Sequence, residues 1–461
     1  MPKKKRQNRR NKHADGLDDL LNRLRGTRDV RGKVSKVRAA LPPGQYADLA
    51  RALTENPYFA RRALPEPFPA SISTFRFSAM LDLLDLSHEL RWASAYLATH
   101  GERLSAFVEE SGRFQQALLV DDFAAAENAL ARIEERFGQS LWLIKRRIPF
   151  LQLATGLDAQ KHYVANIRAA VQDTGVAPFL AYFVSIRSEP SVTPGRFRAQ
   201  YERDADALKL RPDLADYLAF HIVPAIRTDH ADLANLLRFE EVSSAIDYFE
   251  MFMYVARLAA VTAGEEKLKE HLRAAVVSLQ KRVSDPRLGT LAALIGFDGD
   301  SVVPASRLAI QAADSIITGA YYEAVGLAAQ ALHSNPSDPA NLLTLAWAQA
   351  MVSENPSVAH PLVTGLCARL TRLVRQDQAA SDEVPELTRY AVNFDGDGWA
   401  DSLYAAVELA TKPELEPTPC EFSHLSALNM PTLHPFAIEF LPPGPDRVRH
   451  AELIGRVFPG L

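Results

Sequence analysis

The sequence predicts an all-α protein, built as an α-solenoid of stacked helical hairpins. From about residue 40, apolar residues recur at intervals of three and four, the spacing of amphipathic helices. The alternating pattern of strands is scarce before residue 430, and the apolar segment 179–186 is expected to be a buried helix. Pro-containing breaks separate helix-sized windows, which is the layout of stacked hairpins, at 64–71, 188–195, 284–289, 335–339 and 353–357.

Composition narrows the class of protein. Of 461 residues, 47% are hydrophobic and 23% charged, which is enough apolar material for a large core and excludes disorder of the whole chain. Two cysteines, Cys367 and Cys420, are too few for a disulfide framework or a Cys-based zinc site. No secretory signal is expected, because no apolar region follows the basic N-terminus. No membrane span is expected either, because the longest apolar stretch, 248–261, contains Glu250 and Arg257. We therefore expect a soluble, cytoplasmic protein, and the 39 Arg against 13 Lys are typical of a GC-rich bacterial gene.

The N-terminus is a basic arm on an acidic body. Residues 1–38 hold 14 Lys and Arg against 4 Asp, a charge of +10 that leaves −14 on the remainder of a chain whose net charge is −4. Residues 1–13 have no apolar side chain after Met1, so disorder is expected there, followed by a short amphipathic helix with leucines at 17–24. Seven side chains are candidate phosphate contacts for nucleic acid: Lys3, Lys4, Lys5, Arg6, Arg9, Arg10 and Lys12. A solvated tail, or one that folds back on the acidic body, is the alternative.

The clearest predicted hairpin lies at 121–151. One apolar face runs from Phe123 to Phe137, Gly138 follows as a helix end, and Ser140 is a candidate N-cap. A second apolar face then begins at Leu141. The three consecutive basic residues 145–147 spread around that second helix, and a solvated surface is expected for them.

The segment 319–339, GAYYEAVGLAAQALHSNPSDP, places Gly, Tyr, Ala and Pro at characteristic intervals. Gly319 interrupts one helix, Tyr321 and Ala324 begin the inner face of the next, and Pro336 ends it. In order and spacing, residues 305–352 resemble the tetratricopeptide repeat, and 121–151 is a weaker echo. The resemblance departs from the family at Leu308 and Gln311, where the family prefers Trp and Leu. It implies a concave surface that binds a peptide or a partner protein, and no chemistry.

Four segments are predicted on this basis: a basic, largely disordered arm at 1–38, a helical repeat-like region at 39–290, tetratricopeptide-like hairpins at 291–412, and a Pro-rich irregular segment at 413–461.

Short motifs supply no convincing reactive site. The segment 393–401 imitates a calcium loop, but Tyr404 stands where the closing Glu belongs, so a polar turn is expected. Residues 26–34 have the wrong spacing for a phosphate loop, and the segment 229–232 is expected to begin a helix. None of the twelve histidines forms a metal pair, and we predict neither a cofactor nor a metal ion.

The favoured function is therefore that of a non-enzymatic scaffold that binds a protein or peptide on a helical-repeat surface. The alternative is a nucleic-acid-associated protein that uses the arm. A second alternative is an enzyme whose site is assembled across helices and leaves no linear motif.

Overall fold

The computed structural model describes most of the chain between residues 24 and 352. The described residues are 24, 27–74, 84–119, 122–171, 175–189, 192, 194–222, 229–262, 266–295, 308–309, 311–312, 315, 320–336, 341, 344–345, 348–349 and 352. Residues 1–23 of the arm, the calcium-like segment, both cysteines and the Pro-rich segment 413–461 lie outside this set, so the predictions made for them stay predictions. Residues 27–38 were predicted to belong to the largely disordered arm, but they include most of a helix, Val30–Ala40.

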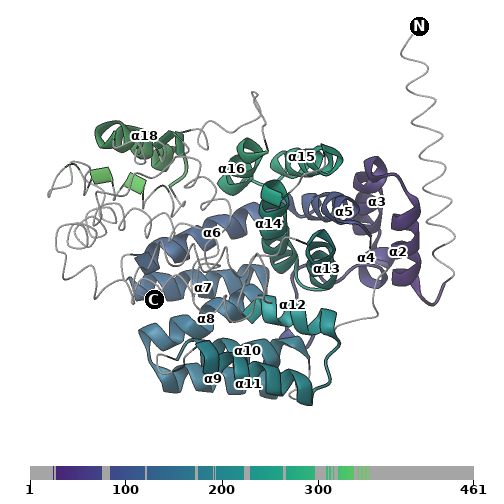
Figure 1. The fold of residues 1–461 in the computed structure, drawn as a ribbon, viewed down its shortest axis with the longest axis horizontal. Helices are drawn as coiled ribbons and strands as arrows, with labels where there is room; N and C mark the ends of the chain where they lie inside the picture. Colours follow the sequence, from purple (N-terminus) through teal and green to yellow (C-terminus); the bar gives the residue numbers. More distant parts are fainter. Residues whose placement is uncertain are drawn as a thin grey trace, which may run out of the picture.

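Three helices form one end of the molecule (Figure 1). They are α2 (Val30–Ala40), α3 (Tyr46–Glu55) and α4 (Pro57–Arg62), with 3-10 turns at Pro43–Gln45 and Ile72–Thr74. Side-chain caps begin two of these helices, because Asp29 accepts a hydrogen bond from the Gly32 N–H and Asn56 accepts one from the Tyr58 N–H.

Eight helices follow, and from α6 to α10 each packs against the next. They are α5 (Leu86–Ala98), α6 (Gly101–Leu119), α7 (Phe123–Phe137), α8 (Leu141–Ala154), α9 (Leu157–Ala170), α10 (Val176–Arg187), α11 (Pro194–Ala207) and α12 (Pro212–Ile222). Helix α10 contains the segment 179–186, so the prediction of a buried helix there is confirmed.

The predicted boundary between α7 and α8 is confirmed in detail. Gly138 ends α7 with φ +75°, and a Cβ added to it would lie 2.3 Å from the carbonyl oxygen of Pro69. Both the left-handed backbone and this close approach require glycine. The hydroxyl of Ser140 accepts a hydrogen bond from the Leu143 N–H at the start of α8.

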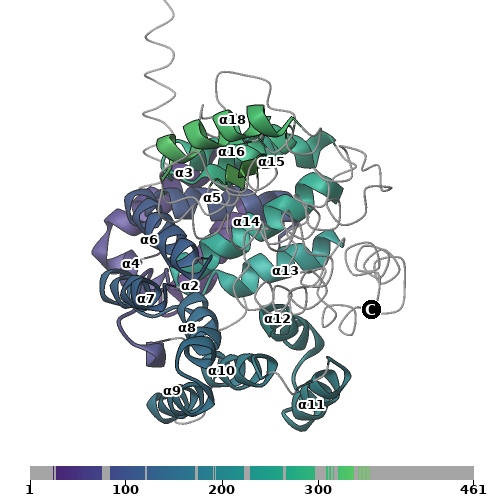
Figure 2. The ribbon, with the colours of Figure 1, turned by 90° about the vertical axis from the view of Figure 1, so that its left-hand side faces the viewer.

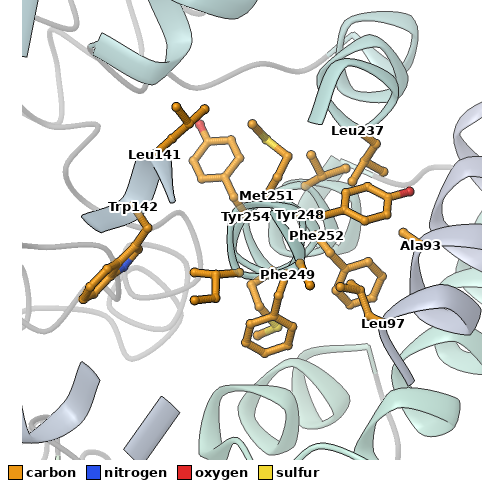
Figure 3. Close-up of a cluster of buried hydrophobic side chains, with 14 of the residues drawn as sticks. Ala93, Leu97, Leu141, Trp142, Leu237, Tyr248, Phe249, Met251, Phe252 and Tyr254 are labelled. Carbon is orange, nitrogen blue, oxygen red and sulfur yellow. The ribbon is translucent and has the colours of Figure 1, made fainter. Parts of the chain in front are cut away.

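The remaining described helices close the body around one central element. They are α13 (His230–Glu240), α14 (Ala245–Thr262), α15 (Glu266–Gln280), α16 (Pro286–Leu294) and α18 (Tyr321–Ser334). Helix α14 contacts α5, α6, α8, α13, α15 and α16. Figure 3 shows aromatic and Met side chains of α14 pointing outward from the helix toward α5, α8 and α13.

These contacts explain the longest apolar stretch of the sequence. A helix that is apolar on nearly every side is buried by neighbours on every side, and α14 is such a helix. None of the described helices is both long enough and apolar enough to span a membrane.

The all-α prediction is confirmed for the described residues, in which every regular element is a helix. Successive helices from α6 to α10 pack against one another. In addition, α5 contacts α13, α14 and α15, which are distant from it in sequence (Figure 2). The solenoid arrangement and the division into four segments stay predictions.

Helix α18 confirms the inner face expected from the spacing at 319–339. Ala324, Ala328 and Ala331 are fully buried, Leu332 is buried and Tyr321 is half-buried. At the end of α18 the side-chain amide of Gln116 in α6 donates a 2.6 Å hydrogen bond to the Pro336 carbonyl.

Ala324→Arg is expected to lower the free energy of unfolding by roughly 3 kcal/mol or more, because it places a charge in a packed contact. Urea denaturation followed by circular dichroism measures the effect. Gln330→Arg, at an exposed position of the same helix, is the control and should change stability by less than about 0.5 kcal/mol. Equal stability of Ala324→Arg and the parent would contradict the assignment of this face.

Candidate functional site

The seven candidate phosphate contacts predicted in the arm, Lys3 to Lys12, lie outside the described residues. Among the described residues, two adjoining networks of titratable side chains are buried between helices. They meet at the end of α13, where Glu240 belongs to one network and Glu241 to the other.

The first network joins α8, α12 and α13 through a lysine, a histidine and a glutamate. Lys145 Nζ lies 3.0 Å from His221 Nδ1, and His221 Nε2 lies 2.5 Å from Glu240 Oε2. The hydroxyl of Tyr217 donates to the same Glu240 oxygen over 3.1 Å. If Glu240 accepts the Nε2 proton, the neutral imidazole presents Nδ1 as an acceptor to the Lys145 amine.

The pKa values of Lys145, His221 and Glu240 in this network are all lowered from their ordinary values. Burial lowers the pKa of Lys145 and that of His221, although the charge of Glu240 opposes both shifts. Burial by itself would raise the pKa of Glu240, but the charge and hydrogen bond of His221, with the charge of Lys145, lower it.

Asp247 of α14 completes the first network and caps helix α8 from a distance in sequence of more than 100 residues. Its carboxylate accepts hydrogen bonds from the Leu141 N–H at 2.9 Å, the Trp142 N–H at 2.7 Å and the Ser244 hydroxyl at 2.7 Å. These bonds satisfy amides that the first turn of a helix leaves without partners. Burial, and then the nearby charge of Glu240, raise the pKa of Asp247 to about 7.

The second network fixes α2 to α5 and α13 through Arg38. Its guanidinium donates to both oxygens of Glu89, at 2.7 and 2.9 Å, and to Glu241 at 2.6 Å. Trp92 Nε1 donates to the other Glu241 oxygen at 3.0 Å, and the Tyr46 hydroxyl donates to the Arg38 carbonyl at 3.0 Å. The side chains of Arg38 and Glu89 are 1% and 0% exposed, so this ion pair is shielded from water.

The pKa of Glu89 is raised to about 7 because desolvation outweighs the attraction of Arg38. Glu241, which shares the guanidinium, adds to the rise.

The chemistry of the first network resembles a relay, since a carboxylate orients an imidazole whose free nitrogen faces an amine. However, His221 is 3% and Glu240 0% exposed, so their side chains do not meet solvent. The networks thus have a clear structural effect, which is to cross-link α2, α5, α8, α12, α13 and α14. Among the described residues, no group of His, Cys, Asp and Glu has the geometry to hold a metal ion.

One sequence prediction is wrong here. Residues 145–147 were expected to form a solvated helix surface, but all three are half-buried. Lys145 belongs to the first network, Arg147 forms an ion pair with Glu134, and the Arg146 guanidinium lies 5.7 Å from the centre of the Trp142 ring. Helix α8 is covered on several sides by α7, α9, α10 and α14, so little of its circumference reaches solvent.

Sequence reasoning also missed the carboxylates of both networks. A charged residue within an apolar helix, such as Asp247 near the start of α14, could have indicated them. A buried carboxylate requires hydrogen-bond donors from neighbouring elements.

Comparison with known proteins finds no matching family model, no matching curated protein and no matching solved structure. The resemblance to the tetratricopeptide repeat therefore rests on the sequence alone, at residues 305–352 and more weakly at 121–151.

Proposed function

We propose that this protein is a non-enzymatic scaffold that holds a partner protein or peptide on the surface of its stacked helices. The observation that carries this proposal is helix α18. Its small residues, spaced as in the tetratricopeptide repeat, are buried as that repeat requires of a packing face.

The solvent-exposed side of α18 carries a side chain that could contact a partner protein. Tyr322 is 82% exposed, the largest fraction among the exposed large apolar side chains of the described residues. Tyrosine is enriched in protein interfaces, because its ring gives apolar area and its hydroxyl a hydrogen bond. The solenoid arrangement, with a concave surface near α18, is part of this proposal.

Affinity purification of the tagged full-length chain, followed by mass spectrometry, is expected to recover a partner whose yield falls at least severalfold with Tyr322→Ala. The variant should melt at the parent's temperature, because the ring is exposed. Tyr182→Ala, an exposed tyrosine on α10, is the matched control and should leave the yield unchanged. Recovery of the same partner at the same yield with Tyr322→Ala would contradict the role given to α18.

The enzyme alternative would be favoured by the Lys145–His221–Glu240 arrangement, but the burial of His221 and Glu240 gives it no support. The nucleic-acid alternative depends on residues 1–13. The same purification from a chain without these residues tests it, because a scaffold that binds through its helices should still recover the partner protein.

A further inference from the structure

The N-terminal helices carry a surface whose charge is opposite to that of the body. Residues 27–64 contain eight Lys and Arg against three acidic residues, a net charge of +5 in a chain whose total is −4. One of the eight, Arg38, is neutralised inside the molecule by two carboxylates. Two of the three acids are also occupied, since Asp29 caps α2 and Asp48 forms an ion pair with Arg51.

Helix α2 presents two of the remaining basic residues on its outer face. Lys33 and Lys36 are exposed and lie one turn apart on the helix, whereas Val30 and Val34 are buried. Their mid-helix position means that the favourable effect of cations on a helix C-terminus does not account for them.

Helix α4, which packs against α2, adds two arginines in its last turn. Arg61 and Arg62 are both exposed. The Arg62 guanidinium is held 5.1 Å from the centre of the Tyr58 ring and donates to the Tyr58 hydroxyl over 3.2 Å. Arg28, two residues before α2, is also exposed.

The surface is attached to a rigid base. Arg38 joins α2 to α5 and α13 through buried ion pairs. The exposed lysines of α2 therefore lie on a helix that is fixed to the body of the protein. Figure 1 places α2, α3 and α4 together at one end of the molecule, away from α9 and α11. Fixed cations of this kind lose less entropy on binding than those of a mobile tail.

We propose that Arg28, Lys33, Lys36, Arg61 and Arg62 form a surface that contacts the phosphate backbone of duplex DNA. The described α2–α4 residues offer no fully exposed aromatic side chain on which unpaired bases could stack, since Tyr58 is half-buried beneath Arg62. Backbone contact without stacking fits a duplex better than a single strand, and it predicts binding that is independent of sequence and weakened by salt. This inference goes beyond the scaffold function and does not depend on it.

The test is fluorescence anisotropy with a labelled 20-base-pair DNA duplex in increasing KCl. For Lys33→Gln/Lys36→Gln, the affinity at low salt should fall roughly tenfold, and the slope of log affinity against log salt should decrease by about 1.8. Arg196→Gln/Arg203→Gln, which removes the same charge from exposed positions of α11, is the matched control and should leave the slope unchanged. Melting temperatures of both variants should equal the parent's, because these side chains are exposed.

Three results would overturn the proposal. The first is an absence of salt-dependent binding of the full-length chain to the duplex. The second is an unchanged slope in Lys33→Gln/Lys36→Gln together with complete loss on deleting residues 1–13, which would assign all binding to the arm. The third is preference for duplex RNA, for a single strand or for vesicles of anionic lipid over the DNA duplex. None of these results bears on whether Tyr322 contacts a partner protein.

Discussion

Arg38→Met is expected to lower the free energy of unfolding by about 3–5 kcal/mol, one of the largest effects of a single substitution in this protein. Methionine keeps much of the apolar stem of the arginine and removes the guanidinium. Glu89 and Glu241 would then remain as two carboxylates at the junction of α5 and α13, without the cation that neutralises them. Denaturation in urea, followed by circular dichroism, measures the change.

The matched control is Arg51→Met on α3. Arg51 is 56% exposed and pairs with Asp48 at 3.6 Å, so its loss should cost less than about 1 kcal/mol. The double variant Arg38→Met/Glu89→Gln should recover part of the stability, since it also removes the carboxylate that becomes unpaired. A cost for Arg38→Met no greater than that for Arg51→Met would contradict the buried network.

Much of the fold could be predicted from the sequence because helix patterns are local. The apolar spacing from Phe123 to Phe137 predicted α7, and Gly138 and Ser140 predicted its boundary with α8. The alanines of 324–331 predicted the buried face of α18. Each depends on residues within about four positions of one another, so one sequence contains the signal.

The candidate site could not be predicted because its contacts are distant in sequence. Arg38 and Glu241 are 203 residues apart, and Asp247 lies 106 residues from the amide that it caps in Leu141. A lysine in a row of three basic residues has the same local pattern whether it faces water or, as Lys145 does, a buried histidine. Only the tertiary packing of α8 distinguishes these cases, and local periodicity does not encode it.

The same distinction separates the two basic segments near the N-terminus. The charge of residues 1–13 is visible in the sequence, whereas the separation of Arg38 from Lys33 and Lys36 depends on the orientation of α2. The structure turns Arg38 inward and leaves the two lysines in solvent. A count of basic residues alone would have assigned all three to one surface.

The second large effect is expected from Asp247, as a change of stability with pH. Because the pKa of this carboxyl is raised to about 7 in the folded protein, the folded state holds the proton more tightly than the unfolded chain does. Its contribution to stability is therefore complete below the unfolded pKa, near 4, and is lost as the pH rises through 7. The shift corresponds to on the order of 4 kcal/mol.

Asp247→Asn isolates this contribution, since asparagine has nearly the same shape and does not titrate. The free energy of unfolding of the parent, minus that of the variant, should fall steadily between pH 4 and pH 7.5 and then level off. Glu89, whose pKa is also raised to about 7, and His100, whose pKa burial lowers to about 4, are present in both proteins and largely cancel.

In the variant, the NH2 group of asparagine would face one of the N–H donors that the Asp247 carboxylate accepts from. This penalty is the same at every pH, so it shifts the difference without creating a slope. The slope therefore reports the titration of Asp247 together with its coupling to Glu240. A difference that rises as the pH increases toward 4 and is then flat up to pH 7 would mean that the hydrogen bonds from Leu141, Trp142 and Ser244 outweigh burial and hold the carboxyl ionised. In that case Asp247 would act as a charged cap of α8, and the pH dependence expected here would be wrong in sign.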